Sequence, residues 1–235
     1  MAFHYSPNIV TNGLKICIDP ANNKSYPGTG FDVYDLSPEL GITYSIVDQV
    51  GWNTSNSGSF IFFTPEVNIV ATASRISSNT NLSFQNLNTE MTIDVWFKRT
   101  ISNNSYNMVW STGLPYFSFL DTNQFLFSFD ATGHKWLYSV KTYSNNVWYN
   151  VCCTLTQTAG TSVAKIYVNG ILESTSPTYT GVTISNYVWP FSLGNHSITR
   201  YPFVGNISCF KLYNRILTDS EILNNFNALK GRFEL

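Results

Sequence analysis

The strongest local signal in this sequence lies at residues 164–173, which read AKIYVNGILE. Apolar and polar side chains alternate on both sides of Asn169-Gly170, as they do in strands that bury one face. Asn-Gly supplies the two consecutive positive φ angles of a type I′ turn, whose twist matches that of a tight hairpin. The stretch therefore predicts two antiparallel strands joined by a two-residue turn.

The same two-residue period recurs along the chain. Five further segments alternate in this way: 14–19 (LKICID), 91–98 (MTIDVWFK), 124–130 (QFLFSFD), 135–141 (KWLYSVK) and 147–156 (VWYNVCCTLT). Short clusters of Asn, Ser, Thr, Asp and Gly lie between several of them. Closely spaced strands joined by short polar turns indicate an antiparallel sandwich rather than alternating strands and helices.

One segment near the C-terminus has the pattern of a helix. Thr218 and Glu221 form a capping box, Leu217 and Ile222 can pack as a hydrophobic staple, and Gly231 is expected to stop the helix. The apolar side of this helix should dock on the sandwich. We expect the helix to plug one end of the sandwich; alternatively, its outer side faces a neighbouring subunit with Asn224, Asn225 and Asn227.

Composition indicates a folded protein with few charges. The 235 residues include 13 Lys and Arg against 14 Asp and Glu, a net charge of −1, and only 11% are charged. Asn, Ser and Thr number 26, 26 and 24, and aromatic residues make up 16%. A nucleic-acid partner is not expected, because phosphate binding needs a basic surface. Aromatic and apolar content is too high for a disordered chain, so one domain over residues 1–235 is expected.

Neither a membrane span nor an export signal is expected. No run of 18 apolar residues occurs, and the start, MAFHYSPNIVTNG, has no basic segment followed by an apolar stretch. The four cysteines, Cys17, Cys152, Cys153 and Cys209, show no C-x-x-C spacing. We expect buried, reduced thiols, with Cys152 and Cys153 on opposite faces of one strand. A Cys17–Cys209 disulfide is the alternative.

Both ends of the chain resemble the laminin-G-like branch of the concanavalin A-like lectin/glucanase superfamily. Residues 13–37 contain GLKICID, NNKSYPG and YDLS in that order, similar to the opening of that group. Residues 203–218 contain FVGNIS and LYNRILT before the helix, similar to its closing strand and final helix. The resemblance implies an all-β fold, a two-sheet antiparallel jelly-roll sandwich with one short C-terminal helix. Such sandwiches occur in lectins, enzymes and structural modules, so the fold alone assigns no function.

The ending NFNALKGRF, residues 225–233, is similar to the endings of virion proteins of tailed phages, especially marine phages of the cyanophage type. This resemblance implies a non-enzymatic virion structural protein, either a capsid decoration or a tail-fibre component. The implied location is the virion, and the implied partners are other virion proteins or further copies of the chain, in a homo-oligomer or a capsid lattice, together with a cell-surface glycan. The alternatives are a free lectin or adhesin and, less favoured, a glycan-active hydrolase.

Catalytic signatures are weak. Retaining glycosidases of the superfamily use a Glu-x-Asp-x-(x)-Glu strand motif that brings two carboxylates about 5 Å apart, and no such triplet is present. Glu90 and Asp94 are nearest, but four strand residues place them about 13 Å apart. Asp94 alternates with apolar neighbours and is interpreted as a solvent-facing residue. No G-x-S-x-G elbow or phosphate-binding loop occurs either.

No cofactor is expected from the sequence itself. The family resemblance implies a structural Ca²⁺ at a loop rim, held by Asp or Asn oxygens. Asp121, Asp130 and Asn195 are placed where loops could converge, but ordinary turn-forming roles explain them equally well, so no ligand is assigned.

Carbohydrate binding requires aromatic faces for sugar C–H groups and amides or hydroxyls for sugar hydroxyls. Trp136 and Tyr138 are expected to share one face of their strand. Such aromatics can instead be cross-strand or core partners. The loop 195–201, NHSITRY, has a suitable composition, so the candidate ligand-binding residues are Trp136, Asn195, His196, Arg200 and Tyr201.

Overall fold

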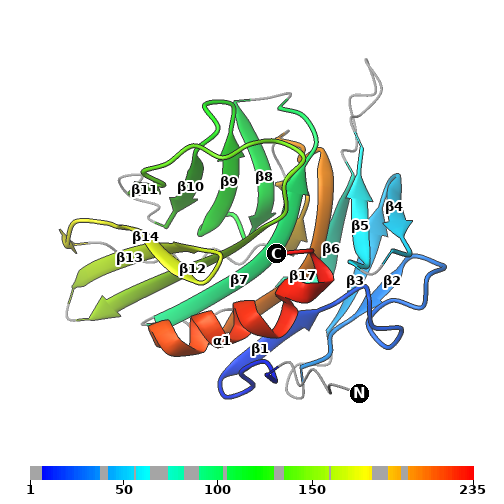
Figure 1. Cartoon of the computed structure of the whole chain (residues 1–235), viewed down its shortest axis with the longest axis horizontal. Helices are drawn as coiled ribbons and strands as arrows, with labels where there is room; N and C mark the ends of the chain where they lie inside the picture. Colours follow the sequence, from blue (N-terminus) through cyan, green and yellow to red (C-terminus); the bar gives the residue numbers. More distant parts are fainter. Residues whose placement is uncertain are drawn as a thin grey trace.

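The computed structural model describes residues 7–37, 42–55, 57–63, 74–81, 90–102, 105–129, 135–158, 160–181, 190–196 and 201–235. These ranges form two antiparallel β-sheets, which we call sheet A and sheet B, and one α-helix close to the C-terminus (Figure 1). The expected all-β, two-sheet antiparallel sandwich with one short C-terminal helix is confirmed.

Sheet A has nine strands, and each pairs antiparallel with its neighbours. Its long central strands, β7 and β17, are formed by segments from the middle and the end of the sequence. The main path runs in the order β14 (Ile171–Thr175), β13 (Thr161–Val168), β12 (Tyr149–Thr158), β7 (Glu90–Arg99), β17 (Gly205–Tyr213), β5 (Ser59–Phe62) and β4 (Val50–Asn53). Off this path, β1 (Leu14–Ile18) pairs with β17, and β15 (Tyr179–Thr180) pairs with β13.

Sheet B has eight strands and faces sheet A across the core. Its order is β11 (Trp136–Tyr138), β10 (Phe125–Ser128), β9 (Tyr116–Leu120), β8 (Tyr106–Ser111), β16 (Pro190–Leu193), β6 (Arg75–Asn81), β3 (Thr43–Val47) and β2 (Asp32–Tyr34). All seven neighbouring pairs are antiparallel. The predicted strand at residues 135–141 is shorter than expected, because only three of its residues pair with β10.

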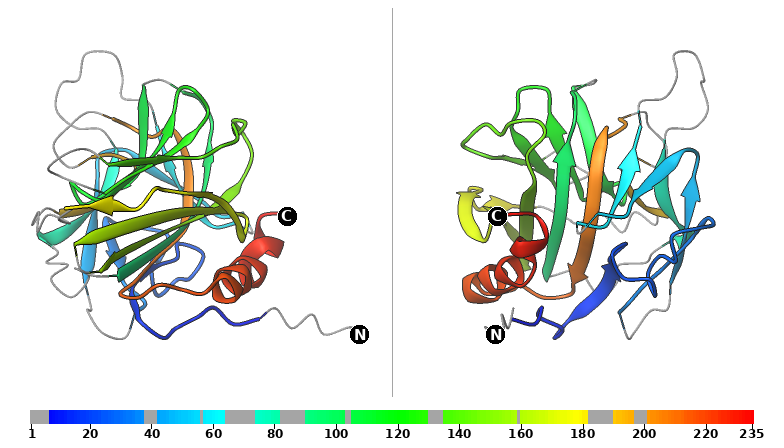
Figure 2. Two further views of the ribbon diagram at one scale, coloured as in Figure 1. Left: turned by 90° about the vertical axis from the view of Figure 1, so that its left-hand side faces the viewer. Right: turned by 45° about the vertical axis from the view of Figure 1, so that its right-hand side comes forward.

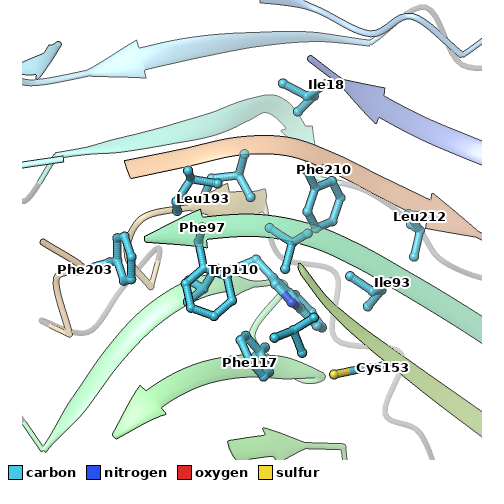
Figure 3. Packing of buried hydrophobic residues seen from close by; sticks show 14 of the residues in the cluster. Ile18, Ile93, Phe97, Trp110, Phe117, Cys153, Leu193, Phe203, Phe210 and Leu212 are labelled. Atoms are coloured by element: carbon cyan, nitrogen blue, oxygen red, sulfur yellow. The ribbon is translucent and has the colours of Figure 1, made fainter. Parts of the chain in front are cut away.

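Aromatic side chains fill much of the space between the sheets (Figure 3). Phe97 of β7 in sheet A faces Phe117 of β9 in sheet B, with ring centroids 5.8 Å apart. The same Phe97 ring makes edge contacts with Phe119, Phe125 and Phe203, with centroids 5.6–6.1 Å away. This edge-to-face geometry is favourable for aromatic rings and stabilises the packing of the two sheets on each other.

The predicted hairpin at residues 164–173 is confirmed. β13 and β14 pair antiparallel, and the turn residues Asn169 and Gly170 have φ angles of 51° and 80°. Gly170 is required for a second reason, because a Cβ at this position would lie 3.0–3.2 Å from Leu223 and Phe226. The turn therefore packs closely against the C-terminal helix.

The helix, α1 (Asp219–Leu229), begins as the sequence predicts. The Glu221 amide donates to Thr218 Oγ1 at 3.3 Å, and the Thr218 amide donates to Glu221 Oε2 at 2.9 Å, which completes the capping box. Its end differs from the expectation, because Gly231 does not stop the helix. After Leu229 the chain continues as a 3₁₀ turn, η2 (Lys230–Arg232), which brings Phe233 back against sheet A.

The helix covers the outer face of sheet A and does not plug an end of the sandwich, which corrects the sequence expectation (Figures 1 and 2). Trp96 of β7 is stacked between Phe226 and Phe233, with centroids 5.6 and 4.1 Å away. The proposed outward role of Asn225 is also wrong, because it is fully buried and its side chain accepts from the Val10 amide at 2.8 Å. Apolar burial on this face explains the position of the helix.

Asp94 is the clearest correction to the sequence analysis. It points away from the sandwich core, as the alternation predicts, but α1 covers that face and leaves Asp94 only 2% exposed. Its Oδ2 lies 3.2 Å from Lys211 Nζ and accepts from Asn225 at 3.3 Å, while its Oδ1 accepts from Asn150. The carboxylate is therefore part of a buried polar network under the helix.

The N-terminal residues that carry the family resemblance tie β1 to the loop after β2. The Asp35 carboxylate accepts from the Cys17 and Ser37 amides, both at 2.8 Å, and from the Ser37 hydroxyl at 2.7 Å. Asp19 at the end of β1 accepts two bonds from Arg232 at 2.8 and 2.9 Å. These conspicuous motif residues therefore act in the structure as backbone and terminal anchors.

All four cysteines are buried free thiols, as expected. Cys153 points into the core between the sheets and Cys152 packs beneath α1, so the two adjacent side chains lie on opposite faces. Cys17 and Cys209 are hydrogen-bonded thiols, and this bond lowers the pKa of Cys17. The alternative disulfide is therefore not formed in this structure. Within the described ranges, no helix has the length and apolar character needed to span a bilayer.

Candidate functional site

The outer face of sheet B carries the side chains that alternate with its core residues. On β9, Phe117 and Phe119 belong to the core, so Tyr116 and Ser118 point outward. The same alternation places Leu137 of β11 inward. Sheet B therefore presents aromatic and small polar side chains on the side opposite sheet A.

Trp136 and Tyr138 lie on this outer face at the edge strand β11. They are 38% and 40% exposed, and their ring centroids are 6.3 Å apart in an edge-to-face arrangement. The sequence prediction that these two residues share a face is thus confirmed.

Strand pairing places Tyr138, Leu126, Ser118 and Met108 side by side across β11, β10, β9 and β8. The Met108 amide then donates to the Tyr201 carbonyl at 3.0 Å, so the chain after β16 extends this row beyond β8. Leu126 and Met108 are 1% and 2% exposed. They form an apolar floor on the outer side of the sheet.

Five aromatic side chains lie in this row or beside it, and we call them the outer aromatic face: Tyr106, Tyr116, Trp136, Tyr138 and Tyr201. The Tyr106 and Tyr201 rings are in contact, with centroids 5.2 Å apart. Burial raises the pKa of the Tyr116 phenol, and the neighbouring phenols of Tyr106, Tyr138 and Tyr201 raise it further. Burial raises the pKa of Tyr138 as well. Tyr116 and Tyr138 therefore stay neutral and keep their O–H donors at physiological pH.

Short serines form the polar part of the floor. Ser118 and Ser128 are fully buried, and the Ser118 hydroxyl has no hydrogen-bond partner. An unpaired buried hydroxyl costs about 1–3 kcal/mol, so it calls for an explanation in a folded protein. Ser118 lies in the same row as Tyr138 and Met108, beneath the aromatic rings, where a bound hydroxyl compound or water could supply the missing bond.

The loop that follows β16 contains most of the residues nominated from the sequence. Asn195 is 3% exposed, and its Oδ1 accepts from the amides of His196 at 2.8 Å and Tyr201 at 3.0 Å. Its side chain therefore closes the loop and positions Tyr201, which is 36% exposed, over β8. Burial lowers the pKa of His196, so this side chain is neutral at pH 7. Arg200 lies outside the described residues.

The structure brings the nominated Trp136 and Tyr201 onto one surface with Tyr138, which was expected only to share a face with Trp136. It adds three residues for which the sequence analysis had no expectation, namely Tyr106, Tyr116 and Ser118. A usable signal existed for two of these. Residues 116–120, YFSFL, alternate with the period of a strand, which would have placed Tyr116 and Ser118 opposite the two phenylalanines. No local pattern points to Tyr106, whose position depends on the contact with Tyr201.

The residues considered for Ca²⁺ do not form a site. Asn195 already uses its Oδ1 for two backbone amides, Asp121 is exposed in a turn, and Asp130 lies outside the described residues. Among the described side chains, no group of three or more His, Cys, Asp or Glu is arranged to hold a metal ion. The part of the donor set that the structure describes therefore does not form a site for the cation that the family resemblance implies.

The carboxylates considered for hydrolysis lie on the other sheet. Glu90 and Asp94 belong to β7, and Asp94 is enclosed by Lys211, Asn150 and Asn225. Lys211 balances the charge of the Asp94 carboxylate and α1 buries it, so this group supports the structure and does not reach the outer face of sheet B.

Comparison with known families gives one match over most of the chain. Residues 71–223 match the laminin-G-type family described as the concanavalin A-like lectin/glucanases superfamily. This range contains all five residues of the outer aromatic face and the start of α1, as far as Leu223. No curated protein matches the chain.

Among solved structures, receptor-binding parts of botulinum neurotoxins have the same fold. The type G receptor-binding domain is 16% identical with a TM-score of 0.65, over 92% of this chain and 51% of that one. A neurotoxin DC binding domain in complex with SialylT is 14% identical with a TM-score of 0.67, over 93% and 52%. A type C structure, reported for cell entry dependent on two ganglioside molecules, is 16% identical with a TM-score of 0.67, over 92% and 51%. This chain spans about half the length of those chains, and the likeness shows the fold.

Proposed function

This chain belongs to the concanavalin A-like lectin/glucanases superfamily, and on that premise we propose that it is a non-enzymatic carbohydrate-recognition module. Its binding surface in this proposal is the outer aromatic face of sheet B. Recognition would use stacking of sugar rings on Trp136, Tyr138 and Tyr201 and hydrogen bonds from the tyrosine hydroxyls. The rigid antiparallel scaffold holds these groups in place before the ligand arrives, which limits the entropy lost on binding.

The observation that carries this proposal is the gathering of four tyrosines and a tryptophan over one row of sheet B. Three of these rings remain 36–40% exposed although they sit on an apolar floor. Tyr and Trp combine a large apolar surface with a polar tip and lose little conformational entropy on binding. A surface with this composition suits ligands that are apolar on one side and hydroxylated on the other, as sugar rings are.

The structural relatives are consistent with this choice. Two of them are described with sialylated or ganglioside ligands, so the fold occurs in proteins that bind carbohydrate. Because sequence identity is 14–16% and the chain spans half of each relative, the position of their sites is not transferred. The proposed surface rests on the side chains of this chain alone.

The setting that we propose for this module is a tailed-phage particle, as a capsid decoration or a tail-fibre component. The ending at residues 225–233 supports this setting through its similarity to phage virion proteins. The net charge of −1 also fits, because a chain with few cations does not bind DNA non-specifically during assembly. Copies of the chain or other virion proteins would then be its partners. A free lectin or adhesin would use the same face and is the second candidate.

Glycan-array binding of the purified chain, compared with two single variants, tests the recognition proposal. Tyr138→Ala removes an exposed ring from the outer aromatic face. Tyr34→Ala is the matched control, since Tyr34 is 44% exposed at β2, the opposite edge of the same sheet. We expect array binding that Tyr138→Ala abolishes and Tyr34→Ala leaves intact. Absence of binding to every glycan, or equal loss in both variants, would contradict the proposal.

Quantitative mass spectrometry of purified phage particles tests the proposed setting. A copy number close to that of the major capsid protein would support capsid decoration, and a few per cent of that number would support a tail-fibre role. Absence of the chain from the particles would contradict the virion setting and favour the free lectin.

A further inference from the structure

We infer that the ligand of the outer aromatic face is an uncharged oligosaccharide and not a sialylated or otherwise anionic glycan. This inference rests on the proposed function and narrows it to one class of ligand. It separates this chain from the two relatives described above with sialylated or ganglioside ligands.

Within the described ranges, the outer aromatic face and its floor consist of uncharged side chains, and two nearby lysines contact other groups. Lys135 Nζ, next to Trp136, lies 5.2 Å from the centre of the Tyr179 ring. Lys141 pairs with Glu173 at 3.4 Å. Anionic groups are bound in proteins through charge-assisted hydrogen bonds, usually from Arg or Lys. Neither of these two lysines is held in position for that task.

Arg99, a buried cation below this region, points away from the outer face. The Arg99 guanidinium is fully buried, lies 3.5 Å from the centre of the Phe119 ring, and donates to the Leu120 carbonyl and Asn145 Oδ1, both at 2.6 Å. The exposed Asp121, whose amide donates to the Ser105 carbonyl at 3.3 Å, also interacts with Arg99, because its carboxylate opposes the lowering of the Arg99 pKa by burial. Arg99 is therefore bound to groups of the protein itself and is not available to a ligand on the outer face.

The polar groups that remain on the face are neutral donors and acceptors. The raised pKa values of Tyr116 and Tyr138 keep these phenols protonated, and the lowered pKa of His196 keeps the imidazole neutral. Neutral hydroxyls form good hydrogen bonds with sugar hydroxyls. An ion that lost its hydration here would pay a desolvation cost that these neutral groups do not compensate. The chemistry of the face therefore matches an uncharged ligand.

The length of the face favours an oligosaccharide over a single sugar. The row from Tyr138 to Met108 crosses three interstrand spacings, about 14 Å in all. Tyr201 extends it beyond β8. Several sugar units can lie across this distance, so each stacks on a different ring.

A glycan array that carries each oligosaccharide in neutral, sialylated and sulfated form tests the inference, followed by calorimetry with the strongest neutral binder. We expect the affinity for the neutral member of each bound set to exceed that for its anionic partners by about tenfold or more, since none of the described cations is placed to compensate their charge. The Kd should change by less than about twofold between 0.05 and 0.5 M NaCl, because screening affects charge–charge attraction and not stacking.

The outcomes separate this inference from the proposed function. Stronger binding of the sialylated or sulfated members, with a Kd that weakens as salt rises, would overturn the inference while the proposed function stood. Loss of that anionic binding in Arg200→Gln, with Lys135→Gln as the matched control, would identify the source of the positive charge. Failure of every glycan to bind would overturn the proposed function and the inference with it.

Discussion

The Lys211 ammonium lies 3.2 Å from the Asp94 carboxylate, and the two side chains are 0% and 2% exposed beneath α1. The two residues are directly opposite each other on β17 and β7. Burial alone would lower the pKa of Lys211, but Asp94 and the nearby Cys209 and Tyr213 hold it well above its ordinary value. Lys211 therefore keeps its positive charge under the helix at neutral pH.

Lys211→Met should destabilise the protein strongly. Removing one partner leaves a buried charge without compensation, which typically costs about 3–5 kcal/mol. The double variant Lys211→Met/Asp94→Asn removes both charges and should recover a large part of that loss. Urea unfolding followed by tryptophan fluorescence measures the free energies. A loss below about 1 kcal/mol in Lys211→Met would mean that the pair behaves like an exposed one.

The same pair shows how far sequence analysis reaches in this fold. The alternation in residues 91–98 predicts correctly that Asp94 points away from the sandwich core. It cannot predict that this face is covered, because the covering helix lies more than a hundred residues later and its docking depends on Trp96, Phe226 and Phe233. Strands, hairpin and helix start follow local rules, whereas the burial of an outer sheet face depends on tertiary packing.

Phe233→Ala should loosen the C-terminal segment from sheet A. Phe233 is 4% exposed and stacks on Trp96 at 4.1 Å, and large-to-small changes at such sites cost about 3–5 kcal/mol. Leu235→Ala is the control, since Leu235 is 45% exposed two residues further along. Thermal unfolding with near-ultraviolet circular dichroism reports both stability and the environment of Trp96. Equal midpoints for the two variants would show that the stacked ring does not hold the segment.

Acid should weaken the start of α1 through Glu221. The Arg215 guanidinium donates two bonds to this carboxylate, at 2.7 and 2.9 Å, which lowers the pKa of Glu221 from 4.5 to about 2. Because the folded-state pKa is the lower one, the stabilisation is complete above pH 4.5 and is lost as the pH falls towards 2.

Glu221→Gln makes this effect measurable. The side chains of Arg215 and Glu221 are 23% and 29% exposed, so the ion pair itself should contribute no more than about 1 kcal/mol. Urea midpoints of the natural chain and the variant should differ at neutral pH and converge below the ordinary pKa of the carboxyl. A difference that stays constant across this range would show that the hydrogen bonds of the cap, and not the charge, stabilise the helix.

The candidate site was only partly predictable for a related reason. Trp136 and Tyr138 share a face through local alternation, and the sequence is sufficient to place them. Tyr106 and Tyr201 are almost a hundred residues apart, and they meet only because the chain after β16 continues along β8. Asn195 was nominated as a ligand-binding amide, whereas its buried side chain bonds two backbone amides and so supports Tyr201.

Two substitutions at Tyr138 separate stacking from hydrogen bonding on the outer aromatic face. Tyr138→Phe keeps the ring and removes one hydroxyl, so we expect affinity for the bound glycan to fall by about 2–10-fold, the value of one hydrogen bond. Tyr138→Ala also removes the 40% exposed ring, and the loss of affinity should be larger than in Tyr138→Phe.

Calorimetry at pH 6, 7.5 and 9 provides a second readout. Because burial raises the pKa of Tyr116 and Tyr138, their phenols stay protonated across this range and the Kd should remain constant. A Kd that weakens between pH 7.5 and 9 would mean that a phenol on the face ionises, which contradicts the neutral hydrogen-bonding surface argued above.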